Sequence, residues 1–551
     1  MFRKKFRISK ERDVKMNMQF QFRSSVVHVA QKFIARFVLF GTFFSSVVSI
    51  AEVSSQPSKV LDWRKIESQS LDFSRKPVEG GVGIYTLPEK AARKFRVTFL
   101  FATGMYNFPQ EQSAEVGATV VNLHLGGAGK RTYEDIVNFV TKLGLGFDVA
   151  LNGEGRVQLS VEGLSGDFSQ AMSLVEDILL HPNFDPQAFE VWKREETDDF
   201  NALLDAGSPA KQARFMNYEM NRLTLGENHY LTQTLMRRSP AGLNTIRPAN
   251  FRNIAGKLLV RTGLNVVLSG GFRDGDVLSV EKLVRKIPQS DVKPEVWLME
   301  RPSQNAGSPE KVHVAIIQKT DMAQASAELR ILNLNVGKIN RTERVDLGIL
   351  EEVFASSGGV VGNDRWTRAM RAESGLSYSA SAQFSEQVLE PNTNFGIWRL
   401  IFQSPLPRVP EACALAKKTW DTFVQKGVFA EEMERARTTI MNGRLAREET
   451  FVDKAIVFEN SIARGDLPNP VSAQSLLARY EAAAGLEERV NRTLNRLAPV
   501  RAPMYLVIMG NVDKTSIDKI SALPEFEITE VVSFSDLVKQ VSHAQPQGHR
   551  I

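Results

Sequence analysis

Apolar and polar positions alternate along this chain with two different periods. Residues 95–101 and 157–161 alternate with the period of two that is typical of strands. Residues 133–143 and 168–180 instead carry apolar side chains at the spacing of amphipathic helices. Helices that cover one face of a mostly antiparallel sheet would bury both patterns, so the sequence predicts an α+β fold.

Several landmarks recur at a nearly constant distance along the chain. An apolar run ends at Gly270, and a similar run ends at Gly510, 240 residues later. A turn that opens an expected helix begins at Phe184 and again at Phe429, 245 residues later. Because the offsets agree, we predict two homologous α/β halves rather than one irregular domain.

The length of 551 residues exceeds what one hydrophobic core normally organises, which also favours two halves. Four prolines between Lys286 and Lys311 indicate a linker between the halves. The predicted division is a signal peptide at 1–51, an N-terminal half at 61–287, a linker at 288–309, a C-terminal half at 310–530 and a tail at 531–551.

The basic charge of the chain lies in its first 51 residues. These residues hold ten Lys and Arg against two acids, a net charge of +8, whereas the whole chain carries +6. The remainder therefore sums to −2 and has no general attraction for phosphate backbones, so no nucleic-acid partner is expected.

This leader has the parts of a secretory signal. A basic segment ends at Arg36, an apolar run covers 37–50, and small residues precede a possible cleavage point at Ala51. The apolar run is too short for a comfortable membrane span. We therefore expect export to the periplasm, with a mitochondrial presequence as the alternative.

Cys413 is the only cysteine, so an internal disulfide is impossible. A zinc site built from cysteines is excluded for the same reason. The small apolar neighbours of Cys413 predict a buried helix position.

Residues 129–136, Gly-Lys-Arg-Thr-Tyr-Glu-Asp-Ile, closely resemble a segment of the pitrilysin/insulinase-type zinc metallopeptidases, the family that includes the mitochondrial processing peptidase. The resemblance implies two halves that form a clam-shell chamber. In active members an inverted zinc motif, H-x-x-E-H, stands just upstream. Its two His and a distant Glu bind zinc, and the motif Glu is the general base.

Counting back from Tyr133 without a gap places the two His positions at Ala118 and Asn122 and the Glu position at Val121. Alanine and valine have no lone pair to donate, and asparagine is a poor zinc ligand beside imidazole. The resemblance therefore implies a non-catalytic member with no metal or cofactor of its own.

Two nearby features could be taken for remnants of the zinc site. His124 lies two residues beyond the lost motif, but no acid stands three or four residues before it. An acidic group lies where the family has its downstream glutamate ligand, and it consists of Glu195, Glu196, Asp198 and Asp199. We interpret His124 as a helix-face histidine and the acids as a solvated helix face.

In the second half, residues 365–378 resemble the family segment that ends in Leu-Arg-Glu-x-x-Gly-Leu-Ala-Tyr. The family's Arg and Tyr fall on Arg371 and Tyr378, with the turn Gly375-Leu376 between them. Family members cleave an extended peptide that is added to a sheet edge. The resemblance implies that Arg371 and Tyr378 bind substrate carbonyls near zinc and steady the charge that develops there. Without it, a surface arginine and a core tyrosine would be expected.

A loop with Gly358, Gly359 and Gly362 precedes this segment. In non-catalytic subunits of the mitochondrial enzyme, a glycine-rich loop in the matching place is implicated in substrate handling. The three glycines are therefore candidate substrate-binding residues, although a helix-ending turn explains them equally well.

These expectations lead to one main hypothesis and two alternatives. The chain is predicted to be a pseudopeptidase subunit, inactive alone, that pairs with a zinc-bearing paralogue in a heterodimer and helps it to cleave an extended peptide. A peptide-binding or structural scaffold of the same fold is the first alternative. An active enzyme with a displaced zinc site is the second, and it would need ligands among His124, His181, His229 and His313, none of which lies at ligand spacing from another.

Overall fold

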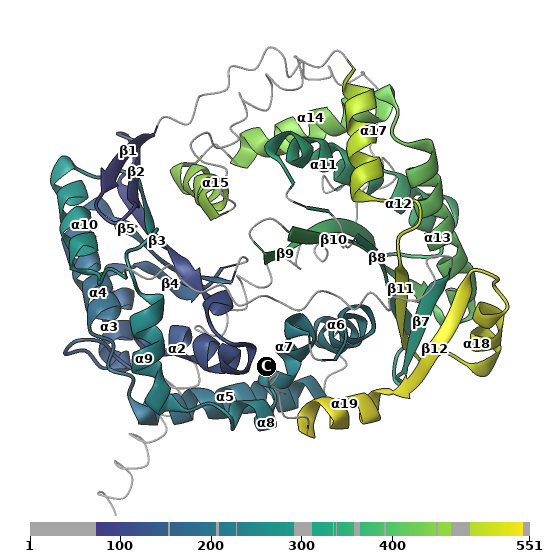
Figure 1. Ribbon diagram of the computed structural model, residues 1–551, viewed down its shortest axis with the longest axis horizontal. Coiled ribbons are helices and arrows are strands. Elements are labelled where there is room, and N and C mark those ends of the chain that lie inside the picture. The colour runs from purple at the N-terminus through teal and green to yellow at the C-terminus, as the bar shows by residue number, and fades with distance from the viewer. Residues whose placement is uncertain are drawn as a thin grey trace, which may run out of the picture. The chain divides into compact units, whose positions relative to one another are not determined.

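The computed structural model describes residues 73–152, 155–204, 209–227, 229–290, 311–333, 336–337, 339–356, 364–390, 393–447, 450–463 and 485–543. Figure 1 colours the chain from purple at its start to yellow at its end. The predicted signal peptide, most of the predicted linker and the loop with Gly358, Gly359 and Gly362 lie outside the described residues.

The first half contains a six-stranded sheet with the strand order β1-β2-β6-β3-β5-β4. Only β2 and β6 run parallel; the other pairs are antiparallel. The strands are β1 (Ser74–Val78), β2 (Val82–Pro88), β3 (Lys94–Gly104), β4 (Gly146–Leu151), β5 (Arg156–Leu164) and β6 (Asn265–Gly270). The longer helices are α2 (Ser113–Leu125), α3 (Tyr133–Leu143), α4 (Phe168–Leu180), α5 (Pro186–Leu204), α6 (Pro209–Leu225), α7 (Tyr230–Arg237), α9 (Phe251–Leu258) and α10 (Asp274–Lys286).

The second half repeats this plan with the strand order β12-β7-β11-β8-β10-β9. Here β7 runs parallel to β11 and β12, and the other pairs are antiparallel. The strands are β7 (Val312–Gln318), β8 (Gln324–Asn333), β9 (Ala380–Glu390), β10 (Thr393–Pro405), β11 (Met504–Gly510) and β12 (Phe526–Ser533). The helices include α11 (Arg341–Phe354), α13 (Val409–Lys426), α14 (Ala430–Arg447), α15 (Phe451–Ala463), α17 (Leu486–Leu497), α18 (Lys514–Ser521) and α19 (Phe534–His543).

Strand register shows that the two halves are structural equivalents. Gly270 ends β6 opposite Pro88 of the parallel strand β2, and Gly510 ends β11 opposite Gln318 of the parallel strand β7. The two expected helices after Phe184 and Phe429 are α5 and α14. The predicted fold class is confirmed: the fold is α+β, with two alike halves that each contain a mostly antiparallel sheet packed with helices.

Each sheet buries one face against helices of its own half. In the first half, this core includes Val97, Phe99 and Val266 together with residues of α2, α4 and α9. In the second half, it includes Trp366, Trp398 and residues of α11, α13 and α17. Cys413 lies inside the second core, as the sequence predicts.

The opposite face of each sheet is covered by a helix from the other half. Phe458 and Ile462 of α15 pack on Tyr85, Leu100 and Val267 of the first sheet. Phe215 and Met220 of α6 pack on residues of the second sheet. Because α6 and α15 follow equivalent strands and helices in the two halves, the exchange is reciprocal. It ties the halves together through apolar contact on two separate faces.

Polar pairs reinforce both of these contacts. On the first sheet, Arg96 and Thr98 hold Glu459 of α15, at 3.0 Å for Arg96 Nε and 2.6 Å for Thr98 Oγ1. On the second sheet, Arg330 donates to the side-chain oxygens of Asn217 and Asn221 of α6. Thr98, Glu459, Arg330 and Asn221 are buried, so their hydrogen bonds offset a desolvation cost that would otherwise oppose the contact.

The second half continues beyond residue 530, where the sequence analysis began a tail. Strand β12 pairs in parallel with β7, and α19 places Leu537 and Val541 in the core. The prediction of a tail from 531 was therefore wrong over residues 531–543. The apolar spacing of Phe534, Leu537 and Val541 is a helix pattern that could have shown this.

Candidate functional site

The positions where active relatives carry the zinc motif lie on α2. Ala118 and Asn122 are both 1% exposed and stand one helical turn apart, and Val121 is partly buried. The Asn122 amide nitrogen donates to the carbonyl oxygen of Ala118 at 2.8 Å, so this side chain is turned back onto its own helix. Its Oδ1 atom is buried and has no hydrogen-bond partner among the described residues. One amide oxygen is too small a donor set for zinc, so these residues do not fit the metal.

His124, two residues further along α2, is a packed aromatic residue. Its ring meets the ring of Phe147 edge-on at 5.8 Å and lies 6.3 Å from the ring of Tyr133. Burial lowers the pKa of His124 to about 4, because the imidazolium would lose its hydration without gaining a partner. The imidazole is therefore neutral near pH 7, and the interpretation as a helix-face histidine agrees with these contacts.

The burial of His124 predicts that the free energy of unfolding depends on pH. His124→Phe is expected to remove this dependence. The folded pKa is about 4 and lies below the unfolded value of 6.5, so the unfolded chain binds the proton first. The stability is present above pH 6.5 and is lost as the pH falls toward 4, by about 3 kcal/mol at most. Urea unfolding at pH 7 and pH 4.5 measures it. An equal pH dependence of the free energy of unfolding in wild type and variant would contradict the assignment.

The acidic group on α5 does not form a metal site. Glu196 pairs with Arg238 at 2.8 Å. The other acids of this group are exposed to solvent on the surface of α5. Among the residues that the structure describes, no three or more His, Cys, Asp or Glu side chains gather as ligands for a metal ion. None of the helices in the described ranges is long and apolar enough to cross a bilayer.

Arg371 lies on a short π-helix, Arg368–Glu373, and Tyr378 lies just past its end. The helix ends at Glu373, and Gly375 follows with a φ of +60°, the left-handed conformation that favours glycine. The amide of Ser377 then donates to the carbonyl of Met370 at 2.8 Å, which folds the chain back beside the helix. Single-turn π-helices are often found at functional sites, because they redirect one side chain out of the regular pattern.

This fold-back brings Arg371 and Tyr378 together. The Arg371 guanidinium carbon lies 4.7 Å from the centre of the Tyr378 ring, a cation–π contact. Tyr378 is 76% exposed, so the expectation of a core tyrosine, which would hold without the family resemblance, is wrong. The two predicted substrate-binding residues are thus adjacent, and the tyrosine is open to solvent.

Buried neighbours hold this pair in place. Asp364 caps the preceding helix by accepting from the amide of Thr367 at 2.7 Å. Arg365 forms a two-pronged ion pair with Glu432 and also donates to the Gly427 carbonyl at 2.7 Å. Trp366 and Met370 are fully buried in the second core. Arg371 and Tyr378, which follow these residues in the chain, are therefore held on a rigid base.

Tyr378 leads directly into β9, which is an edge strand of the second sheet. Among the described residues β9 pairs with no strand besides β10, and the Phe384 amide donates to the Glu351 carboxylate of α11 at 2.8 Å, so only part of its outer edge is open to an added strand. Ser381 and Gln383 are exposed and lie in register with Ile401 and Arg399. The sequence analysis missed these two residues, because an edge position depends on long-range pairing that local alternation does not reveal.

Comparisons with known proteins agree with this fold. Residues 248–440 match the family model described as Peptidase M16 inactive domain. No curated protein is similar enough in sequence to count as a relative. The lost zinc motif lies before the matched range, so the match and the motif are separate observations.

Solved structures share the fold at low sequence identity. The peptidase M16 inactive domain from Pseudomonas fluorescens is 15% identical, with 80% of this chain and 99% of that chain covered and a TM-score of 0.65. A protease from Helicobacter pylori is 11% identical, with 80% and 99% covered and a TM-score of 0.62. The periplasmic protease PqqL from Escherichia coli is 14% identical at a TM-score of 0.62, with 85% of this chain but 49% of PqqL covered.

Fold and site together define the class: a protein of peptidase-like fold that lacks the ligands for the catalytic metal. Residues 248–440 match the inactive domain of the M16 peptidase family, and the fold is that of an M16-like solved structure; both findings agree with the resemblance seen in the sequence.

Proposed function

We propose that this chain is the non-catalytic subunit of a zinc metallopeptidase and supplies Arg371 and Tyr378 to the active site of a zinc-bearing paralogue. The observation that carries the proposal is the adjacent pair of these side chains, an exposed Tyr378 and a partly buried Arg371, beside an edge strand. The lost zinc position at Ala118, Val121 and Asn122 explains why the chain needs a partner.

The chemistry of the pair suits an extended peptide. A peptide added to β9 would exchange backbone hydrogen bonds with the strand, and Tyr378 and Arg371 would donate to its carbonyl oxygens. Both groups are donors at neutral pH, and a guanidinium also offsets negative charge that develops at a scissile carbonyl. In this proposal the partner's zinc, when bound, supplies the activated water.

An exported location is part of the proposal. The leader combines a basic segment with an apolar run, and the fold relative PqqL is a periplasmic protease. We therefore place the mature chain in the periplasm or an equivalent exported compartment, with the mitochondrion as the alternative that a presequence would imply.

Mixing experiments test this function. The purified chain is expected to hydrolyse no peptide, and hydrolysis is expected to appear or rise when a zinc-bearing paralogue is added. The partner's zinc ligands should be required, since Ala118, Val121 and Asn122, the positions of the zinc motif, offer no donor set for the metal.

The second candidate is a peptide-binding or structural scaffold with no part in cleavage. It is favoured by the same open strand edge, because β-strand addition binds a peptide without any chemistry. Under this function the chain binds peptide, but a zinc-bearing paralogue gains no activity from it. Gly358, Gly359 and Gly362 stay candidate binding residues under either function.

A further inference from the structure

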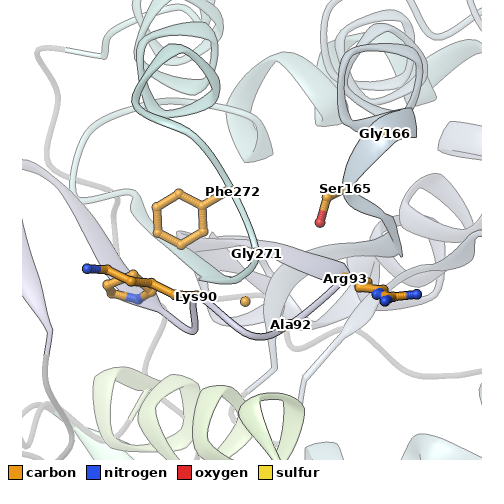
Figure 2. A pocket seen from close by; sticks show the side chains of 9 residues that line it. Lys90, Ala92, Arg93, Ser165, Gly166, Gly271 and Phe272 are labelled. Atoms are coloured by element: carbon orange, nitrogen blue, oxygen red, sulfur yellow. The ribbon is translucent and has the colours of Figure 1, made fainter.

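A pocket of about 530 Å³ opens at one end of the first sheet, away from Arg371 and Tyr378. It lies where β2 and β6 end and where the chain turns from β2 into β3. Figure 2 shows Phe272 above this turn, with Lys90 and Arg93 at its two ends. The complete lining is Pro88, Lys90, Ala92, Arg93, Ser165, Gly166, Gly270, Gly271 and Phe272.

The polar groups of this pocket lack partners. Lys90 and Arg93 are exposed, and neither forms an ion pair with any residue in the described ranges. The Ser165 hydroxyl oxygen is shielded from solvent, has no hydrogen-bond partner among those same residues, and points into the pocket in Figure 2. In Figure 2 the side chains of Lys90 and Arg93 extend away from each other at the two ends of the turn, so they give the pocket a positive field rather than a joint donor set. The Ser165 hydroxyl is a donor without an acceptor, which an anionic group would satisfy.

The nearby carboxylates are already engaged. Glu89 lies 3.8 Å from Lys454 of α15, and Asp167 accepts from the Gln170 amide at 3.4 Å. Neither of them lines the pocket. The positive charge of Lys90 and Arg93 is therefore not neutralised within the lining itself.

Apolar atoms form the rest of the lining. Phe272, Pro88 and Ala92 give the pocket an apolar wall, and the glycines keep its floor close to the backbone. A Cβ atom on Gly271 would lie 1.9 Å from the Ala92 carbonyl oxygen, so no larger residue fits there without backbone movement. A bare inorganic anion would leave the Phe272 ring unused, whereas an acid with an apolar body would cover it.

The second half of the chain provides an internal comparison, because the polar groups at its equivalent positions have partners. By strand register Ser165 corresponds to Leu406, which packs against Gly510. The turn after β7 there ties Lys319 to Asp321 at 2.6 Å. The Gln318 side chain closes the end of the strand by donating to the Val512 carbonyl at 2.7 Å. The cations without an ion-pair partner are thus a feature of the first half and not of the shared fold.

We propose that this pocket binds the terminal carboxylate of a small apolar acid, of which the C-terminal residue of a peptide is the source that suits the proposed function. Ser165 donates to the carboxylate, Arg93 and Lys90 supply positive charge from the two ends of the pocket, and the apolar side chain lies against Phe272. The peptide source rests on the proposed function, whereas the recognition of a carboxylate does not.

Calorimetric titration of the full chain without a partner tests this site. The probes are acetyl-Ala-Ala-Ala-Leu with a free carboxylate, the same peptide as its C-terminal amide, acetyl-leucine and inorganic phosphate. The free acid is expected to bind, and the amide to bind at least about tenfold more weakly, since a charged hydrogen bond is lost. Acetyl-leucine that binds as tightly as the peptide would identify a small acid as the source.

Two variants probe the two halves of the lining. K90Q/R93Q should weaken free-acid binding about tenfold or more, while the control K142Q/K257Q, which removes two exposed lysines elsewhere, should not. Ser165→Leu copies the second half and should block binding with the fold unchanged. Equal binding of acid and amide, binding unaffected by these variants, or phosphate that competes as well as the peptide would overturn the proposal. Because no partner is present, each of these results is independent of the hydrolysis that tests the proposed function.

Discussion

Arg371→Ala or Tyr378→Phe in this chain is expected to lower the kcat/KM of the reconstituted pair about 100-fold, with the partner's zinc site intact. Each variant removes one donor that would face charge developing on the peptide carbonyl, and loss of one such donor typically costs a factor of 10² to 10³. Tyr378→Phe keeps the exposed ring beside Arg371 and deletes only the hydroxyl. Initial rates at several peptide concentrations give kcat and KM separately.

Arg492→Ala is the matched control, because Arg492 is an exposed helix residue paired only with Glu488 on its own helix. Its replacement should change the rate less than twofold and the free energy of unfolding by about 0.5 kcal/mol or less. If the double variant R371A/Y378F retained the full rate of the pair, the shared active site would be wrong and the scaffold function would take its place.

Glu328→Gln is expected to destabilise the folded chain by about 3–5 kcal/mol at pH 7. Glu328 is buried in the second sheet between Arg330 and Arg399, and Arg399 donates to both of its oxygens at 2.8 Å. The variant leaves Arg330, which is 2% exposed, with amide oxygens but no anion to balance its charge. Urea unfolding measures the loss.

The same carboxylate makes stability depend on acid. Burial alone would raise the pKa of Glu328, but Arg330 and Arg399 outweigh burial and lower the pKa to about 2. A folded pKa below the unfolded value means that this stability is present above about pH 4.5 and is lost as the pH falls toward 2. The pH range in which Glu328 loses its contribution to stability lies below the range in which His124 does. The two contributions can therefore be measured separately by choosing the pH.

Glu431→Gln is the control for Glu328, since Glu431 is 88% exposed and pairs with Arg435 on the surface. It should change the free energy of unfolding by about 0.5 kcal/mol or less. A loss below about 1 kcal/mol for Glu328→Gln would show that the buried ion pair contributes little to the contact between the halves.

Helices whose ends are determined by neighbouring residues in the sequence were predictable. The helix expected at residues 133–143 is α3 with those bounds, because Thr132 and Asp135 cap its start and Gly144 ends it with a φ of +61°. The helix expected at 168–180 is α4. The repeat was also visible, since the glycines at the ends of β6 and β11 are needed in both halves.

The exchange of α6 and α15 could not be predicted in this way. It depends on contacts between residues more than 100 positions apart, such as Arg330 with Asn221 and Arg96 with Glu459. Their sequence neighbourhoods look like ordinary amphipathic helices and strands. No local period distinguishes a helix that packs on its own sheet from one that packs on the other.

The site was predictable only in part. The resemblance located Arg371 and Tyr378, and the structure brings them together. The π-helix that redirects Arg371 and the high exposure of Tyr378 have no signature in the hydrophobic pattern. The pocket at Lys90 and Ser165 is formed by three separate turns, so no pattern in the sequence groups its residues.

The most direct test of the central claim is the initial rate of peptide hydrolysis by this chain, by a zinc-bearing paralogue, and by their equimolar mixture. We predict no hydrolysis by this chain with or without added zinc, and a rate in the mixture well above that of the paralogue alone. Hydrolysis by this chain alone that survives removal of trace metal, or a mixture no faster than the paralogue, would contradict the account.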